Sequence, residues 1–167
     1  MPIPKTQKSL TALFEKLGAR DPDGWAKSEV TERIPQLLRF LFLREAWNYV
    51  QDEHDHTWIA RQIESSGKRP NEPYACLGSV LSRCRALGVS DQELTDMARC
   101  QQAAMMFRLC YLMSSGPEDP PEELDEVSWG LFRVNESGKP VGPRIAALHE
   151  SVLETDPTGR EMRPRDA

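Results

Sequence analysis

The stretch that decides the fold is IPQLLRFLFLREAWNYV, residues 34–50. At 3.6 residues per turn, its large apolar side chains lie on every side of a helix. They are Leu37, Leu38, Phe40, Leu41, Phe42, Leu43 and Trp47. Such a helix is buried in a core or crosses a membrane, and Glu45 and Asn48 leave far fewer than the ~18 uninterrupted apolar residues of a membrane span. The stretch therefore predicts a buried helix at the centre of a helical protein.

Helix-terminal signals and the helical spacing of apolar residues predict further helices on both sides of this stretch. Gly18 is placed to end a first helix, and Asp21 followed by Pro22 is a typical helix start. Ser90 and Glu93 form a capping box that opens a long helix. The predicted segments are residues 10–17, a turn around Trp25, 58–65, 74–87, 90–113 and 145–152. We expect a mostly all-α fold, a compact orthogonal or irregular bundle of five or six helices.

The C-terminal third has a different character. Residues 129–142 predict a small β-hairpin, in which Pro140 and Pro143 restrict the second arm to an edge strand. Residues 155–167 predict an extended or disordered C-terminal tail. A chain of 167 residues matches one domain by size, so we expect a single helical domain over residues 8–154.

Charge and composition narrow the classes of partner. The formal net charge is -5, and residues 117–167 carry 12 acidic but only 6 basic groups. Without a basic stripe, the chain is not expected to bind nucleic acid. The N-terminus lacks the apolar run of a signal peptide, so we expect a cytoplasmic protein that does not bind a membrane.

The four cysteines follow no metal-ligand or disulfide pattern. Cys76, Cys84, Cys100 and Cys110 are separated by 8, 16 and 10 residues, whereas zinc sites commonly use closely spaced pairs. Buried free cysteine behaves as a small hydrophobic residue. We therefore expect reduced thiols in the core and no cofactor.

The densest group of potential metal ligands is Asp52, Glu53, His54, Asp55 and His56. Glu53-x-x-His56 resembles one copy of the ligand pair that ferritin-like di-iron bundles use twice, but the chain has no second copy. We therefore interpret the segment as a polar link between helices, with Asp52 or Asp55 as a helix cap. The alternative is a divalent-metal site formed by Asp52, Glu53, His54 and His56.

Two charged residues fall among apolar ones on their helices. Glu45 shares an arc of the helical wheel with Leu38 and Leu41, and Arg108 shares one with Met97, Met105 and Leu112. A carboxylate in an apolar arc needs a partner. We therefore predict that Glu45 meets Arg83 or Arg108 inside the bundle, with Arg108 preferred. This buried polar pair would be a structural ion pair or part of a functional cleft.

The candidate partner-binding residues lie in the acidic, proline-rich segment and at the start of the hairpin. They are Glu122, Glu123, Asp125 and Trp129. We expect a non-catalytic protein of the adaptor or inhibitor type that binds another protein, with a homo-oligomer also possible. The alternative is a helical metal-dependent enzyme, a hydrolase or an oxygen-activating enzyme, with its site around residues 45–56.

Overall fold

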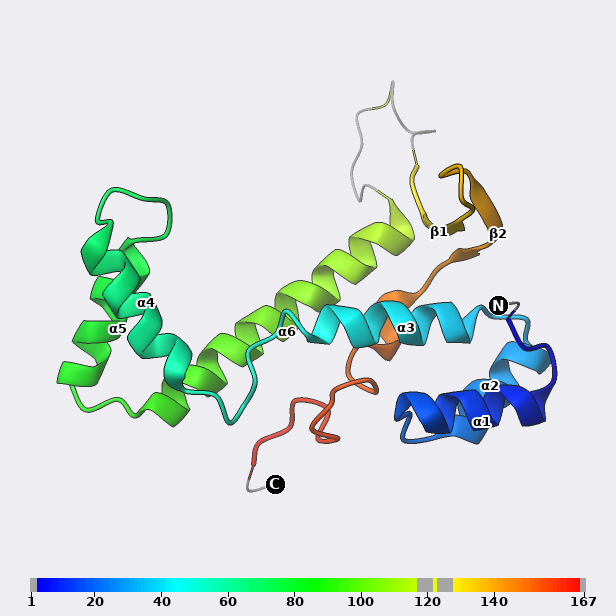
Figure 1. Ribbon diagram of the computed structural model, residues 1–167, viewed down its shortest axis with the longest axis horizontal. Coiled ribbons are helices and arrows are strands. Elements are labelled where there is room, and N and C mark those ends of the chain that lie inside the picture. Colours follow the sequence, from blue (N-terminus) through cyan, green and yellow to red (C-terminus); the bar gives the residue numbers. More distant parts are fainter. Residues whose placement is uncertain (1–2, 117–121, 123–127, 166–167) are drawn as a thin grey trace. The chain divides into compact units, whose positions relative to one another are not determined.

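The computed structural model describes residues 3–116, 122 and 128–165 (Figure 1). Within these residues the protein is mostly α-helical, with six α-helices and one two-stranded antiparallel sheet, which confirms the predicted fold class. In chain order the elements are α1 (Gln7–Leu17), α2 (Pro22–Thr31), α3 (Gln36–Trp47), α4 (Thr57–Lys68), α5 (Cys76–Ala86), α6 (Asp91–Ser115), β1 (Leu131–Val134), β2 (Pro140–Ile145) and the 3-10 helix η2 (Leu148–Ser151). None of the described helices combines the length and apolar character that crossing a membrane requires.

Contacts divide the chain into two compact units. The first unit contains residues 1–48 and 105–167, and the second contains residues 49–104. Each unit has a hydrophobic cluster of its own. The expectation of one domain over residues 8–154 stays a prediction.

The first unit begins with helices whose ends match local sequence signals. The side chain of Asp21 accepts a hydrogen bond from the Gly24 amide at 3.0 Å, and Pro22 occupies the first helical position of α2. Gly18 ends α1 with a φ of 84°, which a residue with a side chain adopts only at a cost. The entry of α3 is different because Pro35 offers no capping side chain. Glu29 replaces the cap and accepts the Leu37 amide at 2.7 Å.

The core of α1, α2 and α3 is built around three aromatic rings. Phe14, Trp25 and Phe40 have ring centroids 5.3–5.9 Å apart, with edge-to-face contacts at Phe40. Leu10 and Leu37 complete this buried cluster with Ala26. Burying each of the large side chains contributes about 1.5–3 kcal/mol relative to exposure. This cluster fixes the three helices against one another.

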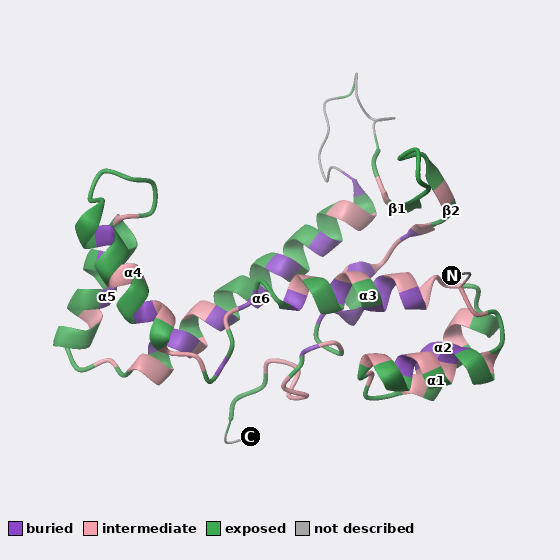
Figure 2. Ribbon diagram, viewed as in Figure 1, coloured by how far each residue is buried: buried purple, intermediate pink, exposed green. Residues whose placement is uncertain are grey.

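Helix α3 is buried on one side only, which corrects the prediction of an all-round buried helix (Figure 2). The buried side carries Phe40, Leu43 and Trp47, whereas Leu41 is exposed. The charged residue on the buried side is Arg39, which is 3% exposed. Its guanidinium donates to the Ala147 carbonyl at 2.6 Å and to Ser151 Oγ at 2.8 Å.

Residues 145–165 belong to this unit and do not form the helix predicted over residues 145–152. Residues 155–165, in the predicted extended or disordered tail, make specific hydrogen bonds. Only η2 is helical here, because Ile145 ends β2 and Ala147 has a φ of 53°. Trp47 Nε1 donates to the Val152 carbonyl at 3.1 Å. Asp156 is 2% exposed and accepts hydrogen bonds from Thr158 and from the Met162 amide. The charge and proline content of the segment do not reveal these contacts.

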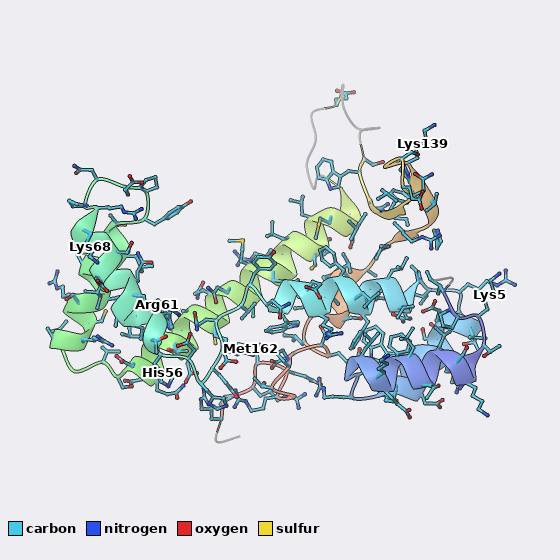
Figure 3. The ribbon with its side chains drawn as sticks, in the orientation of Figure 1. Lys5, His56, Arg61, Lys68, Lys139 and Met162 are labelled. Carbon is cyan, nitrogen blue, oxygen red and sulfur yellow. The ribbon has the colours of Figure 1, made fainter. Side chains whose placement is uncertain are left out.

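The hairpin forms slightly later in the chain than the predicted residues 129–142. Leu131 pairs with Ile145 and Arg133 with Val141, with a register shift between Leu131 and Arg133. Asn135 forms the turn: its Oδ1 accepts bonds from the Ser137 and Lys139 amides, both at 3.0 Å. Lys139 lies at the tip of this hairpin in Figure 3.

The second unit packs α4 and α5 against the N-terminal part of α6. Its core contains Ile59, Leu81 and Leu94. Helices α4 and α5 approach closely at Gly78, where an added Cβ would lie 2.4 Å from the Ser66 Cβ. The capping box at the start of α6 is present, since the Ser90 amide donates to Glu93 Oε2 at 2.8 Å and Ser90 Oγ accepts the Glu93 amide at 3.2 Å.

The cysteines are free but are not all in the core. Cys110 is buried, Cys84 is half-buried, and Cys76 and Cys100 are exposed. The expectation of core thiols is therefore correct for Cys110 and wrong for Cys76 and Cys100. Cys76 lies on α5 and Cys100 on α6, and the spacing of the cysteines did not reveal that both are exposed.

Candidate functional site

The segment of residues 52–56 forms a tight turn and a helix entry. Asp52 accepts the His54 amide at 2.7 Å, and Asp55 accepts the Thr57 amide at 2.8 Å and the Thr57 hydroxyl at 2.5 Å. Asp55 also pairs with Arg61 at 3.1 Å. The hydrogen bonds from Thr57 are the main reason that the pKa of Asp55 lies below its usual value. Asp55 therefore binds the first residue of α4, although the N-cap position itself is His56, whose side chain makes no cap hydrogen bond.

The two histidines of this segment serve different purposes. His54 is exposed, with Nε2 3.3 Å from a carboxylate oxygen of the buried Glu53. His56 precedes α4 and turns inward, with Nδ1 3.0 Å from the hydroxyl of Thr95 (Figure 3). Trp58 Nε1 donates to the same hydroxyl at 3.1 Å. Thr95 is fully buried, so this polar group holds α4 to α6.

The predicted metal site at Asp52, Glu53, His54 and His56 is not assembled. Within the described part of the chain, no three His, Cys, Asp or Glu side chains converge as metal ligands would. The physical reason is that Asp52 accepts a backbone amide, while His54 and His56 point to different partners. The metalloenzyme alternative, with its site around residues 45–56, stays a prediction.

The predicted buried pair of Glu45 and Arg108 is also not formed. Both residues are exposed, and Glu45 accepts a hydrogen bond from Asn48 at 3.3 Å. The arc that Glu45 shares with Leu38 and Leu41 is the outer side of α3, because Leu41 is exposed and Leu38 is only half-buried. The ion pairs of the described residues do not include Glu45 with Arg108.

The predicted partner-binding residues are partly described. Glu123 and Asp125 lie outside the described residues, and Glu122 is exposed. Trp129 is 43% exposed, and its indole Nε1 donates to the Leu112 carbonyl at 2.8 Å. The hydrogen bond fixes the Trp129 ring beside the last turns of α6.

The C-terminal half of α6 has an apolar surface that the sequence did not identify. Met105, Leu109 and Leu112 are 53%, 50% and 41% exposed, and their i, i+4, i+7 spacing places them on one side of the helix. Together with Arg108 and Trp129 they form what we call the α6 apolar face, which lies within the first unit.

The side of α6 that lies opposite the α6 apolar face is the side that packs into the core. Met106 and Cys110 point into the core of the first unit. Between the two sides, Phe107 and Tyr111 contact the imidazole of His149, with ring centroids 5.7 Å and 4.9 Å apart. The helix is therefore apolar in most directions, but the described part of the first unit buries only part of its circumference (Figure 2).

Comparisons with protein-family models, with curated proteins and with solved structures give no match to this chain. The function is therefore inferred from the side chains of the protein itself.

Proposed function

We propose that the protein acts by binding another protein and that the α6 apolar face is its contact surface. The observation that carries this proposal is the exposure of Met105, Leu109 and Leu112 on one side of α6, with the exposed Trp129 bonded to the Leu112 carbonyl. Contiguous apolar patches on a protein surface mark sites of interaction with proteins, membranes or ligands. The face consists of side chains on successive turns of one helix, an arrangement that helices use to recognise other proteins.

Trp129 gives this face a fixed anchor. Tryptophan is among the residues that contribute most to protein interfaces, and a hot-spot residue typically costs about 2 kcal/mol or more when truncated. The bond from its indole to the Leu112 carbonyl holds the ring before any partner arrives. A side chain that is already ordered loses less conformational entropy on binding.

Arg108 indicates the charge of the partner. It lies among the apolar residues of the face, is exposed, and has no ion pair with another described residue. The helix has no carboxylate between Asp96 and Ser115, so a second copy bound through the same face would bring two arginines together. The partner proposed is therefore an amphipathic helix with an apolar stripe and a flanking carboxylate.

The dimensions of the face suit such a partner. Residues 105–112 cover about two helical turns, or about 10 Å of axis. Two turns present an i, i+4, i+7 set of anchors, which is the pattern that helix-in-groove and helix-on-helix recognition uses. An adaptor or inhibitor function is compatible with a contact of this size.

The test uses two synthetic helical peptides with the same leucine stripe, flanked by glutamate in one and by lysine in the other. Binding is followed by the fluorescence of Trp129 and by sedimentation. We expect the acidic peptide to bind more tightly, Leu109→Gln to weaken it by at least about tenfold, and Arg108→Glu to reverse the preference between the peptides.

The matched control is Val30→Gln, because Val30 is 42% exposed on α2 and outside the α6 apolar face. It should leave binding unchanged, and Trp129→Phe should remove the change in tryptophan fluorescence that accompanies binding. Equal binding of both peptides, no binding of either, or a dimer that Leu109→Gln dissociates would contradict the proposal.

A further inference from the structure

A second feature of the first unit is a cavity of about 190 Å³ lined by residues that precede and open α3 and by β2. Its apolar lining includes Ile34, Leu38 and Val141. Two exposed arginines also line it, Arg33 before α3 and Arg133 in β1. The cavity does not include any residue of the α6 apolar face, and a ligand bound in it is therefore independent of the proposed function.

Both arginines are presented by irregular backbone. Arg33 has a φ of 61°, a left-handed conformation that costs a residue with a side chain on the order of 1 kcal/mol. Arg133 follows the register shift in β1, and its strand partner Val141 is followed by Gly142 with a φ of 79°. Such bulges redirect side chains and are frequent next to binding sites.

The charge of the cavity favours an anion. Neither Arg33 nor Arg133 forms an ion pair with another described residue. The acidic group at the cavity is Glu29, whose carboxylate already accepts the Leu37 amide at 2.7 Å. The lining thus contains two arginines that form no ion pair with another described residue and one carboxylate that is engaged with the backbone of α3.

The size and lining of the cavity limit the ligand further. Sites for drug-sized ligands and cofactors usually measure about 300–1,000 Å³, so this cavity holds only one residue or a fragment of similar size. The apolar lining and the nearby Glu29 disfavour a strongly hydrated dianion such as phosphate. A guanidinium group matches a carboxylate in two parallel hydrogen bonds.

We propose that this cavity binds a carboxylate carried on a short branched apolar group. Arg33 and Arg133 pair with the carboxylate, and Ile34, Leu38 and Val141 contact the apolar group. Two sources supply this chemistry: a free short-chain branched acid, and the C-terminal residue of a peptide that ends in leucine, isoleucine or valine.

The test compares 4-methylpentanoate with its neutral amide, and acetyl-Gly-Gly-Leu with its C-terminal amide, by calorimetry and amide NMR shifts on the full chain. We expect each acid to bind at least about tenfold more tightly than its amide. Equal affinity of the two acids would identify the free short-chain acid as the ligand. A peptide acid that binds at least about tenfold more tightly than 4-methylpentanoate would identify the C-terminal residue of a peptide as the ligand.

Variants separate binding from folding. Arg33→Gln and Arg133→Gln should each weaken acid binding by at least about tenfold, while Arg44→Gln, at an exposed arginine of α3 that does not line the cavity, should have no effect. Arg33→Asn should raise the melting temperature, since asparagine tolerates positive φ, and should still lose binding.

Three outcomes would overturn the proposal. They are amides that bind as well as acids, Arg33 and Arg133 variants with unchanged affinity, and no binding of either acid at about 10 mM.

Discussion

Replacing Arg39 with methionine should loosen the attachment of the C-terminal segment to α3. The guanidinium of Arg39 donates to the Ala147 carbonyl at 2.6 Å and to Ser151 Oγ at 2.8 Å. Methionine retains most of the buried aliphatic stem and removes both donors. The two acceptors then lie in a buried environment without their charged partner.

The magnitude follows from three contributions. Each hydrogen bond from a charged donor contributes about 1.5–3 kcal/mol, so removing both costs about 3–6 kcal/mol. Part of this is offset because burial of the guanidinium is unfavourable, which also lowers the pKa of Arg39. The ion pair with Glu150 at 3.7 Å involves a carboxylate side chain that is 63% exposed, and it contributes only about 0–1 kcal/mol. The expected loss in free energy of unfolding is about 2–4 kcal/mol.

The assay is urea unfolding followed by tryptophan fluorescence in a Trp58→Phe background, so that the second unit contributes no signal. Glu150→Gln is the control and should change the free energy of unfolding by at most about 0.5 kcal/mol. Ser151→Ala should cost about 1 kcal/mol alone and little more when Arg39 is already methionine. A value for Arg39→Met within about 0.5 kcal/mol of the unsubstituted protein would refute the role assigned to Arg39.

Three further predictions concern packing, pH dependence and thiol reactivity. Gly78→Ala should destabilise the second unit by about 1–3 kcal/mol, because the new Cβ would lie 2.4 Å from that of Ser66; Gly67→Ala, where an added Cβ meets nothing within 4 Å, should stabilise it by about 0.5–1 kcal/mol in thermal unfolding. Burial raises the pKa of the Glu29 carboxyl, so the folded protein keeps this carboxyl protonated to a higher pH than the unfolded chain does. Ionisation of Glu29 therefore lowers the free energy of unfolding as pH rises between the unfolded and folded pKa values. The urea midpoint of Glu29→Gln should rise relative to that of the unsubstituted protein across this pH window, and a constant difference would contradict the raised pKa. Burial raises the pKa of the Cys110 thiol to about 11, so Cys76 and Cys100 should react rapidly with a disulfide reagent near pH 8 while Cys110 reacts only after unfolding. A fast phase that survives serine substitution at Cys76, Cys84 and Cys100 would disprove this.

Local signals in the sequence predicted the parts of the fold that depend on neighbouring residues. The capping box of Ser90 and Glu93, and the start of α2 at Asp21, involve side chains within three residues of the amides they cap. The hairpin turn at Asn135 is similarly short-range. These features follow from backbone hydrogen bonding that the unfolded chain already favours.

The parts that could not be predicted depend on distant residues. A helical wheel shows that Arg39 and Glu45 lie on different sides of α3, but not which side faces the core. The partners of Arg39 lie 108 and 112 residues further along the chain. The same ambiguity applies to α6, where the expectation of a buried side chain was correct for Cys110 and wrong for Arg108. The sequence did not identify the α6 apolar face, because residue type alone does not distinguish an exposed leucine from a buried one.

The discontinuous first unit has a consequence during synthesis. Residues 1–48 leave the ribosome well before residues 105–167, which complete the same unit. Ala147 lies 108 residues after Arg39. At a synthesis rate of about 5–20 residues per second, about 5–20 s pass between the synthesis of Arg39 and that of its hydrogen-bond partner Ala147. During that interval the guanidinium of Arg39 remains hydrated. It keeps water at the apolar side of α3, a surface that would otherwise attract other nascent chains.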